Sequence, residues 1–447
     1  MKKRRLVSLL AIAAFCLTGC ALFDDSDIAI DNHYNTPEDT AEEPGPDAVV
    51  INGVEGTESP NAPDSLCFKN VSYASENNSI KNTYALGQAN HHEINVNNNE
   101  DYYATGSSNN YDIYVPKSAL EKKDQDQIVI LFVHGGAWVA GFKTDVNPYV
   151  HEFANKGYIT ATIKYTLLKR EILKDDAVDD GSTNTPLSIF RDLDEIDACI
   201  SSIKSVLKEL GFNENKLKLV IGGASSGSHL AMLYSYSRGQ NSAIPIQFIV
   251  DAVGPTDIKS YAWKEFINNS DEVLSNGLHR QALEDQESNL RELPVSGESF
   301  RWNEYQTMRI ANGMCGVPYT ITEAKNASTD QHNIDTPNSA SILMTMPDGG
   351  EDQLSVTYWL NKGINNFPII CAYAGKDTVV GINQYATLQI ALDNLNIQYG
   401  YTYFQNSKHE EITAEFDEMK YNQLVGQIHT WCSNILNNEP LAVLPHQ

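Results

Sequence analysis

The chain has 447 residues, of which 41% are hydrophobic and 20% are charged, and its formal net charge is −26 at pH 7. A hydrophobic share of this size can fill a large core, and an α/β fold of this length can form a single domain. So acidic a protein is poorly matched to nucleic acids and to anionic membrane surfaces, because both carry negative charge themselves. We therefore expect no nucleic-acid partner.

The first twenty residues have the pattern of a secretory signal. Residues 2–5 are all basic, residues 6–17 form an apolar stretch in which Ser8 is the exception, and Leu17-Thr18-Gly19-Cys20 closes the pattern. The apolar stretch is too short to span a membrane as a helix. The ending resembles the bacterial lipobox, which implies a lipoprotein signal peptide over residues 1–19 and a lipid anchor on Cys20. A plain secretory signal cut nearby is the alternative.

Ala21 follows the predicted anchor, and this choice resembles the sorting pattern for the outer membrane of a Gram-negative cell. The expected location is therefore the bacterial cell envelope, with the lipid as the membrane contact. Residues 21–64 contain twelve Asp or Glu and no Lys or Arg, and they have few apolar groups to bury. We interpret residues 20–66 as an acidic disordered tether, residues 67–437 as the folded domain and residues 438–447 as a C-terminal tail.

Five cysteines remain when Cys16 and Cys20 are set aside, and their number is odd, so at least one stays unpaired within the chain. They are Cys67, Cys199, Cys315, Cys371 and Cys432. Their spacing matches no zinc pattern, and the pairing is left open. We expect neither a metal nor a cofactor.

Strands alternate with helices through the predicted domain. After a polar lead-in over residues 68–108, strands are expected at 111–116, 128–133, 159–165, 216–221, 246–254, 367–374 and 398–404, and helices at 146–156, 189–210, 228–236 and 383–395. The strand at 111–116 ends at a proline and is expected at the sheet edge. The alternation predicts an α/β fold with a mainly parallel sheet and helices on both faces.

Two motifs follow predicted strands. The buried strand at 128–133 leads into His134-Gly135-Gly136-Ala137-Trp138, where backbone without side chains can present N–H groups to a substrate oxygen. The strand at 216–221 leads into Gly223-Ala224-Ser225-Ser226-Gly227, followed by a predicted helix. This is the nucleophile-elbow pattern, which holds a serine hydroxyl clear of the sheet beneath a helix amino terminus. A glycine-rich turn that caps a helix with serine is the alternative.

Together the two motifs resemble the esterase/lipase branch of the α/β-hydrolases, the HGGG-type carboxylesterases, over roughly residues 110–437. The sequence departs from the usual pattern at Ala137, which replaces a third glycine, and at Ala224 and Ser226, which replace an acidic residue and an alanine. The resemblance implies the α/β-hydrolase fold. It also implies a lid-like insert at about residues 258–365, whose aromatic residues form either a small core of their own or a substrate pocket.

The remaining catalytic groups should follow the serine in the order acid, then histidine. Asp377 comes directly after the strand at 367–374, and His409 comes after the strand at 398–404. Both therefore fall on the carboxyl edge of the sheet, where ligands bind in such folds. The rival histidines include His229, four residues past the serine on its helix, and His134, which is expected to be structural.

The resemblance assigns a nucleophile, an acid, a base and three oxyanion donors, which are Ser225, Asp377, His409, and the N–H groups of Gly135, Gly136 and Ser226. The expected function is hydrolysis of carboxylic esters, on a small molecule or a polymer, through an acyl-enzyme. A serine peptidase or amidase of the same fold and a non-catalytic binding lipoprotein remain as alternatives. Acyl and alcohol specificity and oligomeric state are left open.

Overall fold

The computed structural model describes residues 49–51, 53–73, 80–82, 92–94, 109–138, 141–167, 189–258, 352–377, 379–413 and 418–444. The predicted signal peptide, Cys20, most of the tether, Cys315 and residues 259–351 of the insert lie outside the described residues.

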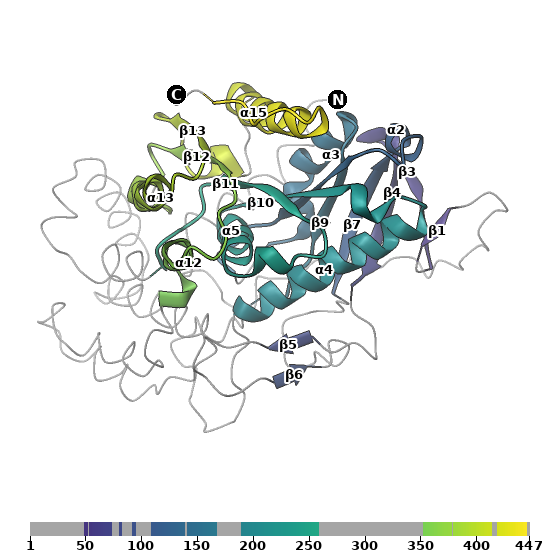
Figure 1. The fold of residues 1–447 in the computed structure, drawn as a ribbon, viewed down its shortest axis with the longest axis horizontal. Helices are drawn as coiled ribbons and strands as arrows, with labels where there is room; N and C mark the ends of the chain where they lie inside the picture. Colours follow the sequence, from purple (N-terminus) through teal and green to yellow (C-terminus); the bar gives the residue numbers. More distant parts are fainter. Residues whose placement is uncertain are drawn as a thin grey trace, which may run out of the picture.

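A nine-stranded sheet organises the molecule, with the order β13-β12-β11-β10-β8-β9-β7-β4-β3 (Figure 1). All neighbours from β13 to β9 in that order are parallel, whereas β7 is antiparallel to both β9 and β4. The strands are β3 (Thr57–Ser59), β4 (Ala62–Ser72), β7 (Asn110–Pro116), β8 (Gln127–Val133), β9 (Ile159–Ile163), β10 (Leu217–Ala224), β11 (Ile246–Ala252), β12 (Ile369–Ala374) and β13 (Tyr399–Phe404). Two short antiparallel pairs, β1 (Val50–Ile51) with β2 (Val54–Glu55) and β5 (Ile80–Asn82) with β6 (His92–Ile94), lie outside this sheet.

Helices cover both faces of the sheet. In Figure 1, α3 and α15 lie on one face and α4 and α5 on the other. The pairing of α3 with α15 is direct, because the rings of Tyr149 and Tyr421 lie 5.2 Å apart. The helices are α2 (Lys117–Leu120), α3 (Asn147–Asn155), α4 (Ile189–Glu209), α5 (Ser226–Arg238), α12 (Val356–Lys362), α13 (Ile382–Asn394), α14 (Glu410–Thr413) and α15 (Glu418–Leu436), with short 3-10 turns such as η7 (Asp352–Leu354). The predicted α/β-hydrolase fold is confirmed.

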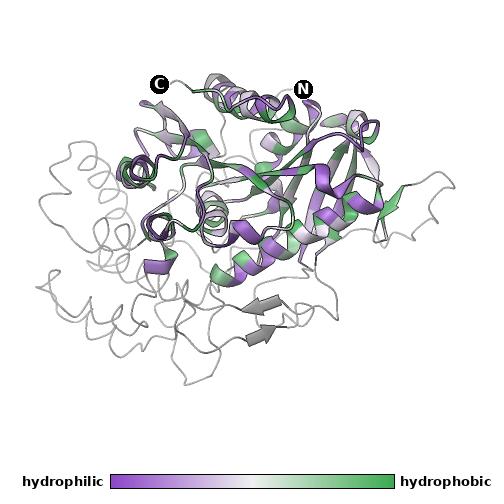
Figure 2. Cartoon of the chain, in the orientation of Figure 1, coloured by the Kyte–Doolittle hydropathy of each residue, from purple (hydrophilic) through white to green (hydrophobic). Residues whose placement is uncertain are grey.

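Continuous apolar strands explain why the sheet is buried on both faces. Every residue of β8, β9 and β12 is buried. Such strands need a helical layer on each side, and amphipathic helices provide it. Figure 2 shows mixed colour along α4, whose apolar positions Ile196, Ile200 and Ile203 are buried.

The folded part begins earlier than expected. The tether was predicted to reach residue 66, but β1 starts at Val50 and β4 starts at Ala62. The reason is backbone pairing, which does not depend on a high local apolar content: β4 pairs with β3 on one side and with β7 on the other. The strand at 110–116 is therefore an inner strand, and the prediction of an edge strand was wrong.

The folded part also ends later than expected. The predicted tail starts at residue 438, yet Leu444 is 6% exposed and lies against Gly400 of β13. The side chain of Gln398 donates to the carbonyl oxygens of Leu441 and Ala442. Likewise, residues 352–362, placed in the insert by the sequence, form η7 and α12, and α12 packs on α5 of the core.

Candidate active site

Ser225 stands in a strained turn between β10 and α5. Its backbone has φ 54° and ψ −124°, and a positive φ costs a non-glycine residue about 1–2 kcal/mol. The surrounding backbone holds this conformation: the N–H of Ser225 donates to Ala252 O at 2.9 Å, and its carbonyl accepts from His229 N at 3.1 Å. The turn thus has the geometry of a nucleophile elbow.

The glycines of this turn allow α5 to approach β8. A Cβ on Gly227 would lie 2.1 Å from Val133 O, and one on Gly223 would lie 2.6 Å from the same oxygen. A Cβ on Gly135 would lie 3.2 Å from Ser225 Cβ. The two glycine motifs therefore meet, and Gly135 lies beside Ser225.

His134 contacts the backbone of the loop that follows β8 (residues 134–138), hereafter called the oxyanion loop after its predicted role. It is buried, and this burial lowers its pKa to about 4, so the ring is neutral at pH 7. Its Nδ1 lies 2.8 Å from Gly135 O, and only an N–H at this position can bond a carbonyl oxygen. Because the peptide is planar and trans, fixing this carbonyl turns the N–H of Gly136 the opposite way. Tyr165 stacks on the ring at 4.3 Å.

Asp377 and His409 form a buried pair. His409 Nδ1 lies 2.7 Å from Asp377 Oδ2, and the two side chains are 2% and 0% exposed. The other carboxylate oxygen, Oδ1, accepts from the N–H groups of Val379 and Val380, each at 2.8 Å. The aspartate is thereby oriented by the backbone, and it in turn orients the imidazole. With Nδ1 occupied, Nε2 is the nitrogen that can exchange a proton with a reacting group.

The pKa of His409 is raised above its usual value. Burial on its own would lower this pKa, but the charge of Asp377 and the hydrogen bond to it act in the opposite direction and prevail, with a smaller contribution from Glu410. An imidazole stabilised in its protonated form is suited to taking up a proton from a hydroxyl group.

The structure brings the predicted residues to one edge of the sheet. Ser225 follows β10, the oxyanion loop follows β8, Asp377 follows β12 and His409 follows β13. These four strands are parallel, so their carboxyl ends share that edge. Ser226, predicted as an oxyanion donor, is the first residue of α5.

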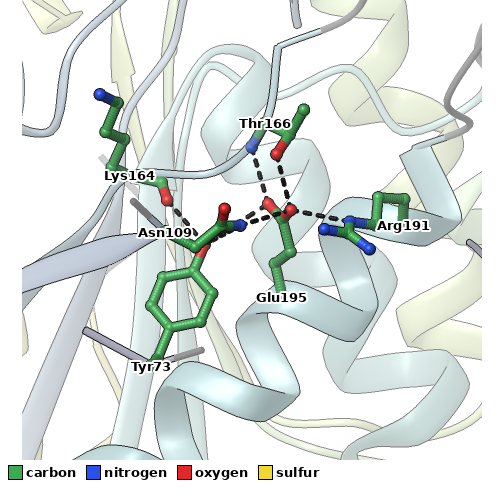
Figure 3. Close-up of polar contacts among 6 residues, drawn as sticks. All are labelled: Tyr73, Asn109, Lys164, Thr166, Arg191 and Glu195. Carbon is green, nitrogen blue, oxygen red and sulfur yellow. Dashed lines mark hydrogen bonds and ion pairs between the residues drawn. The ribbon is translucent and has the colours of Figure 1, made fainter. Parts of the chain in front are cut away.

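One buried carboxylate that was not predicted from the sequence lies on α4, against Thr166 in the segment that follows β9. Glu195 of α4 accepts hydrogen bonds from Asn109, from the backbone and hydroxyl of Thr166 and from Arg191 (Figure 3). The hydroxyl of Tyr73, which donates to Lys164 O at 2.7 Å, lies 3.4 Å from Glu195 Oε2. The Arg191 Nε to Glu195 Oε1 distance is 2.8 Å, and both side chains are completely buried. The i,i+4 spacing on α4 was visible in the sequence, but the other partners are 29 to 122 residues away.

Within the described ranges, no group of His, Cys, Asp and Glu could hold a metal ion, and no helix is long and apolar enough to cross a membrane. Cys67, Cys199, Cys371 and Cys432 are unpaired and buried. Free cysteines buried in this way pack as small apolar residues.

Comparison with known proteins gives one family model, described as BD-FAE, which matches residues 111–296. Curated proteins that match include non-reducing polyketide synthase adrD from Penicillium rubens, 26% identical over 156 residues. Another is non-reducing polyketide synthase atr1 from Stereocaulon alpinum, 24% identical over 150 residues. The matches span 34% and 33% of this chain but only 6% of each synthase.

Similar solved structures include esterase B from Lactobacillus rhamnosis, with 13% identity, 86% of this chain and 91% of that one covered, and a TM-score of 0.46. A truncated carbohydrate esterase from gut microbiota has 13% identity, coverage of 83% and 97%, and a TM-score of 0.44. Carboxyl esterase 2 from Tuber melanosporum has 15% identity, coverage of 71% and 78%, and a TM-score of 0.41. For this chain, the strand order and the strand–serine–helix turn identify the α/β-hydrolase fold.

Proposed function

We propose that the protein is a serine hydrolase that cleaves carboxylic esters through an acyl-enzyme on Ser225. The observation that carries the proposal is the buried Asp377–His409 pair on the same sheet edge as a strained serine turn. The match of residues 111–296 to the BD-FAE model, an α/β-hydrolase-like esterase domain, supports ester hydrolysis.

In the proposed reaction, Ser225 Oγ attacks the ester carbonyl carbon while His409 Nε2 takes the hydroxyl proton. Asp377 stabilises the imidazolium that results. The N–H groups of Gly135, Gly136 and Ser226 stabilise the negative charge on the carbonyl oxygen. When the C–O bond breaks, His409 returns the proton to the departing alcohol. Water then attacks the acyl-enzyme with His409 again as base, and the acid and free Ser225 are formed.

The first test compares Ser225→Ala with the wild type. We expect the variant to lose labelling by a fluorophosphonate and about 10⁴- to 10⁶-fold in turnover, because no other group replaces the nucleophile. Ser228→Ala is the control: its Oγ links Gly223 O to Ala252 N beneath the turn, so it should lower stability but retain labelling. An active Ser225→Ala protein would exclude the proposed nucleophile.

A panel of p-nitrophenyl esters from acetate to decanoate, run beside p-nitroanilide amides, separates the alternatives. Faster turnover of esters supports the proposal, and faster turnover of amides identifies a peptidase or amidase instead. Absence of both activities, with a properly folded protein, supports a binding lipoprotein. The same panel reports acyl-chain preference.

We also propose that the protein is held at the bacterial cell envelope by a lipid on Cys20, in the outer membrane if the cell is Gram-negative. The support is the basic, apolar and Leu-Thr-Gly-Cys pattern at residues 2–20. Cys20→Ala should release the protein from the membrane fraction or leave an unprocessed precursor. A Cys20→Ala protein that is fully processed and membrane-bound would contradict the anchor.

A further inference from the structure

The oxyanion loop has a backbone that its own sequence does not favour. Three consecutive residues have positive φ: Gly136 at 117°, Ala137 at 52° and Trp138 at 64°. Only glycine adopts such angles readily. The conformation of Ala137 and Trp138 must therefore be maintained by contacts elsewhere in the fold.

Trp138 makes such a contact with the helix that follows the serine. Its indole Nε1 donates to His229 Nδ1 at 3.2 Å, and the two rings are perpendicular, with centroids 5.3 Å apart. His229 is completely buried and lies one helical turn after Ser225, with its backbone N–H bonded to Ser225 O. The contact thus joins the strained loop to the first turn of α5.

The partners of His229 determine its tautomer. An indole N–H can only donate, so Nδ1 must be an acceptor without a proton. Nε2 lies 2.7 Å from the carbonyl oxygen of Leu354, which can only accept, so Nε2 carries the proton. Protonating Nδ1 as well would set two donors against each other, and burial, which lowers the pKa of His229 to about 4, keeps the ring neutral.

We propose that His229 is a positioning residue for catalysis: through Trp138 it holds the N–H groups of Gly135 and Gly136 in register with Ser225. This inference rests on the proposed function, since it concerns the same site. The two hydrogen bonds join Trp138 to His229 and His229 to the carbonyl oxygen of Leu354. The role of His229 differs from that of His409, because His229 is bonded at both ring nitrogens and exchanges no proton with substrate.

A positioning role predicts a fall in kcat rather than a rise in KM, because the oxyanion donors act most strongly on the transition state. Trp138→Phe keeps most of the ring and removes the donor. His229→Gln places its amide group where Nε2 was and leaves no acceptor at the position of Nδ1. His229→Asn places its amide oxygen at the position of Nδ1, so the acceptor for Trp138 Nε1 is retained. We expect kcat to fall about 10- to 100-fold in the first two, with KM changed less than about twofold.

His229→Asn should recover most of this loss, and the double variant Trp138→Phe/His229→Gln should be no slower than the slower single variant, because both break one hydrogen bond. Tyr234→Phe is the matched control. It removes another hydrogen bond from α5, to Asp197 of α4 at 2.7 Å, and should leave kcat at the wild-type value. All assays run well below the unfolding temperatures of every variant.

Hydrogen–deuterium exchange of the peptide covering residues 134–138 gives a second readout that needs no activity. Exchange should accelerate in Trp138→Phe and His229→Gln and stay near wild type in His229→Asn and Tyr234→Phe. Wild-type kcat and exchange in the first two variants would overturn the inference while the esterase proposal stands. If the wild type neither hydrolyses esters nor reacts with fluorophosphonate, the proposed function fails. Wild-type exchange in Trp138→Phe and His229→Gln would in that case also overturn the positioning of the loop by His229.

Discussion

The two oxygens of Asp377 have separate partners, and this separation predicts the effect of a single-atom change. Oδ1 is held by two backbone N–H groups, so Asp377→Asn should place its amide oxygen there and its NH₂ group opposite His409 Nδ1. The imidazole then carries its proton on Nε2, which is the wrong tautomer for a base. We expect kcat toward p-nitrophenyl acetate to fall about 10⁴-fold.

Unfolding measurements accompany this assay. The two backbone bonds to Oδ1 survive in Asp377→Asn, so the variant should unfold cooperatively like the wild type. A variant that retains more than about a tenth of wild-type kcat would mean that Asp377 does not orient the base.

The raised pKa of His409 predicts the acid side of the pH–rate profile. The base must be neutral, so kcat/KM should rise with pH, with a midpoint above the ordinary histidine value of about 6.5. Removing the charge of Asp377 should lower that midpoint. The stability that the charged pair contributes depends on pH in the opposite direction to the rate. It is complete below the unfolded-state pKa of His409 and is lost as pH rises through the folded-state pKa. Rates from pH 5 to 9 for wild type and Asp377→Asn test both midpoints.

At the scale of the elements, two helical glycines offer a matched comparison. A Cβ on Gly227, at the start of α5, would lie 2.1 Å from Val133 O and 2.4 Å from His134 O, both of which are backbone atoms. Gly227→Ala should therefore separate α5 from β8 and yield little folded protein. A Cβ on Gly426, inside α15, would meet no atom within 4 Å. Gly426→Ala should stabilise by about 0.5–1 kcal/mol through helix propensity.

Thermal unfolding and soluble yield distinguish the two glycine variants. The Gly426→Ala gain corresponds to about 1–2 °C, since the shift per kcal/mol falls with chain length. A soluble Gly227→Ala protein with wild-type unfolding temperature would contradict the close approach of the elbow to β8.

A strand could be predicted from the sequence where its own residues form a continuous apolar run. The runs that became β8 and β12 are apolar throughout, because helices cover both of their faces. The strand β4 was missed: only part of its side chains are buried, and it is held by hydrogen bonds to β3 and β7. A strand held mainly by hydrogen bonds to adjacent strands shows little hydrophobic periodicity in its own sequence.

The same division applies to the candidate site. Ser225, the oxyanion loop, Asp377 and His409 each lie in a loop directly after a predicted strand, so topology alone brings them to one edge. His229 was dismissed as a rival base, and Glu195 was overlooked, because their partners lie far away in the sequence. Trp138, for example, is 91 residues from His229.

At the scale of the whole molecule, Glu195 joins parts of the chain that are distant in sequence. Replacing it with alanine leaves Arg191 buried without the carboxylate that it bonds and removes acceptors from Asn109 and Thr166. Breaking a buried ion pair in this way costs about 3–5 kcal/mol. We expect Glu195→Ala to lower the denaturant midpoint accordingly.

Glu209 provides the control, because it lies on the same helix but is exposed. Glu209→Ala should change the free energy of unfolding by no more than about 0.5 kcal/mol. Equal midpoints for Glu195→Ala and the wild type would show that the buried carboxylate contributes nothing to stability.

The position of Glu195 also bears on how this chain can diversify. Tyr73 and Asn109 border residues 74–108, Thr166 and Arg191 flank residues 168–188, and all four contact this one carboxylate. Each bordered stretch thus leaves and re-enters the core at nearly the same point, beside the carboxyl end of β9. Doubling the length of such an excursion costs only about 0.6 kcal/mol in closure entropy. We therefore expect changes in the length of either stretch to be tolerated, because the residues that border it stay anchored on Glu195.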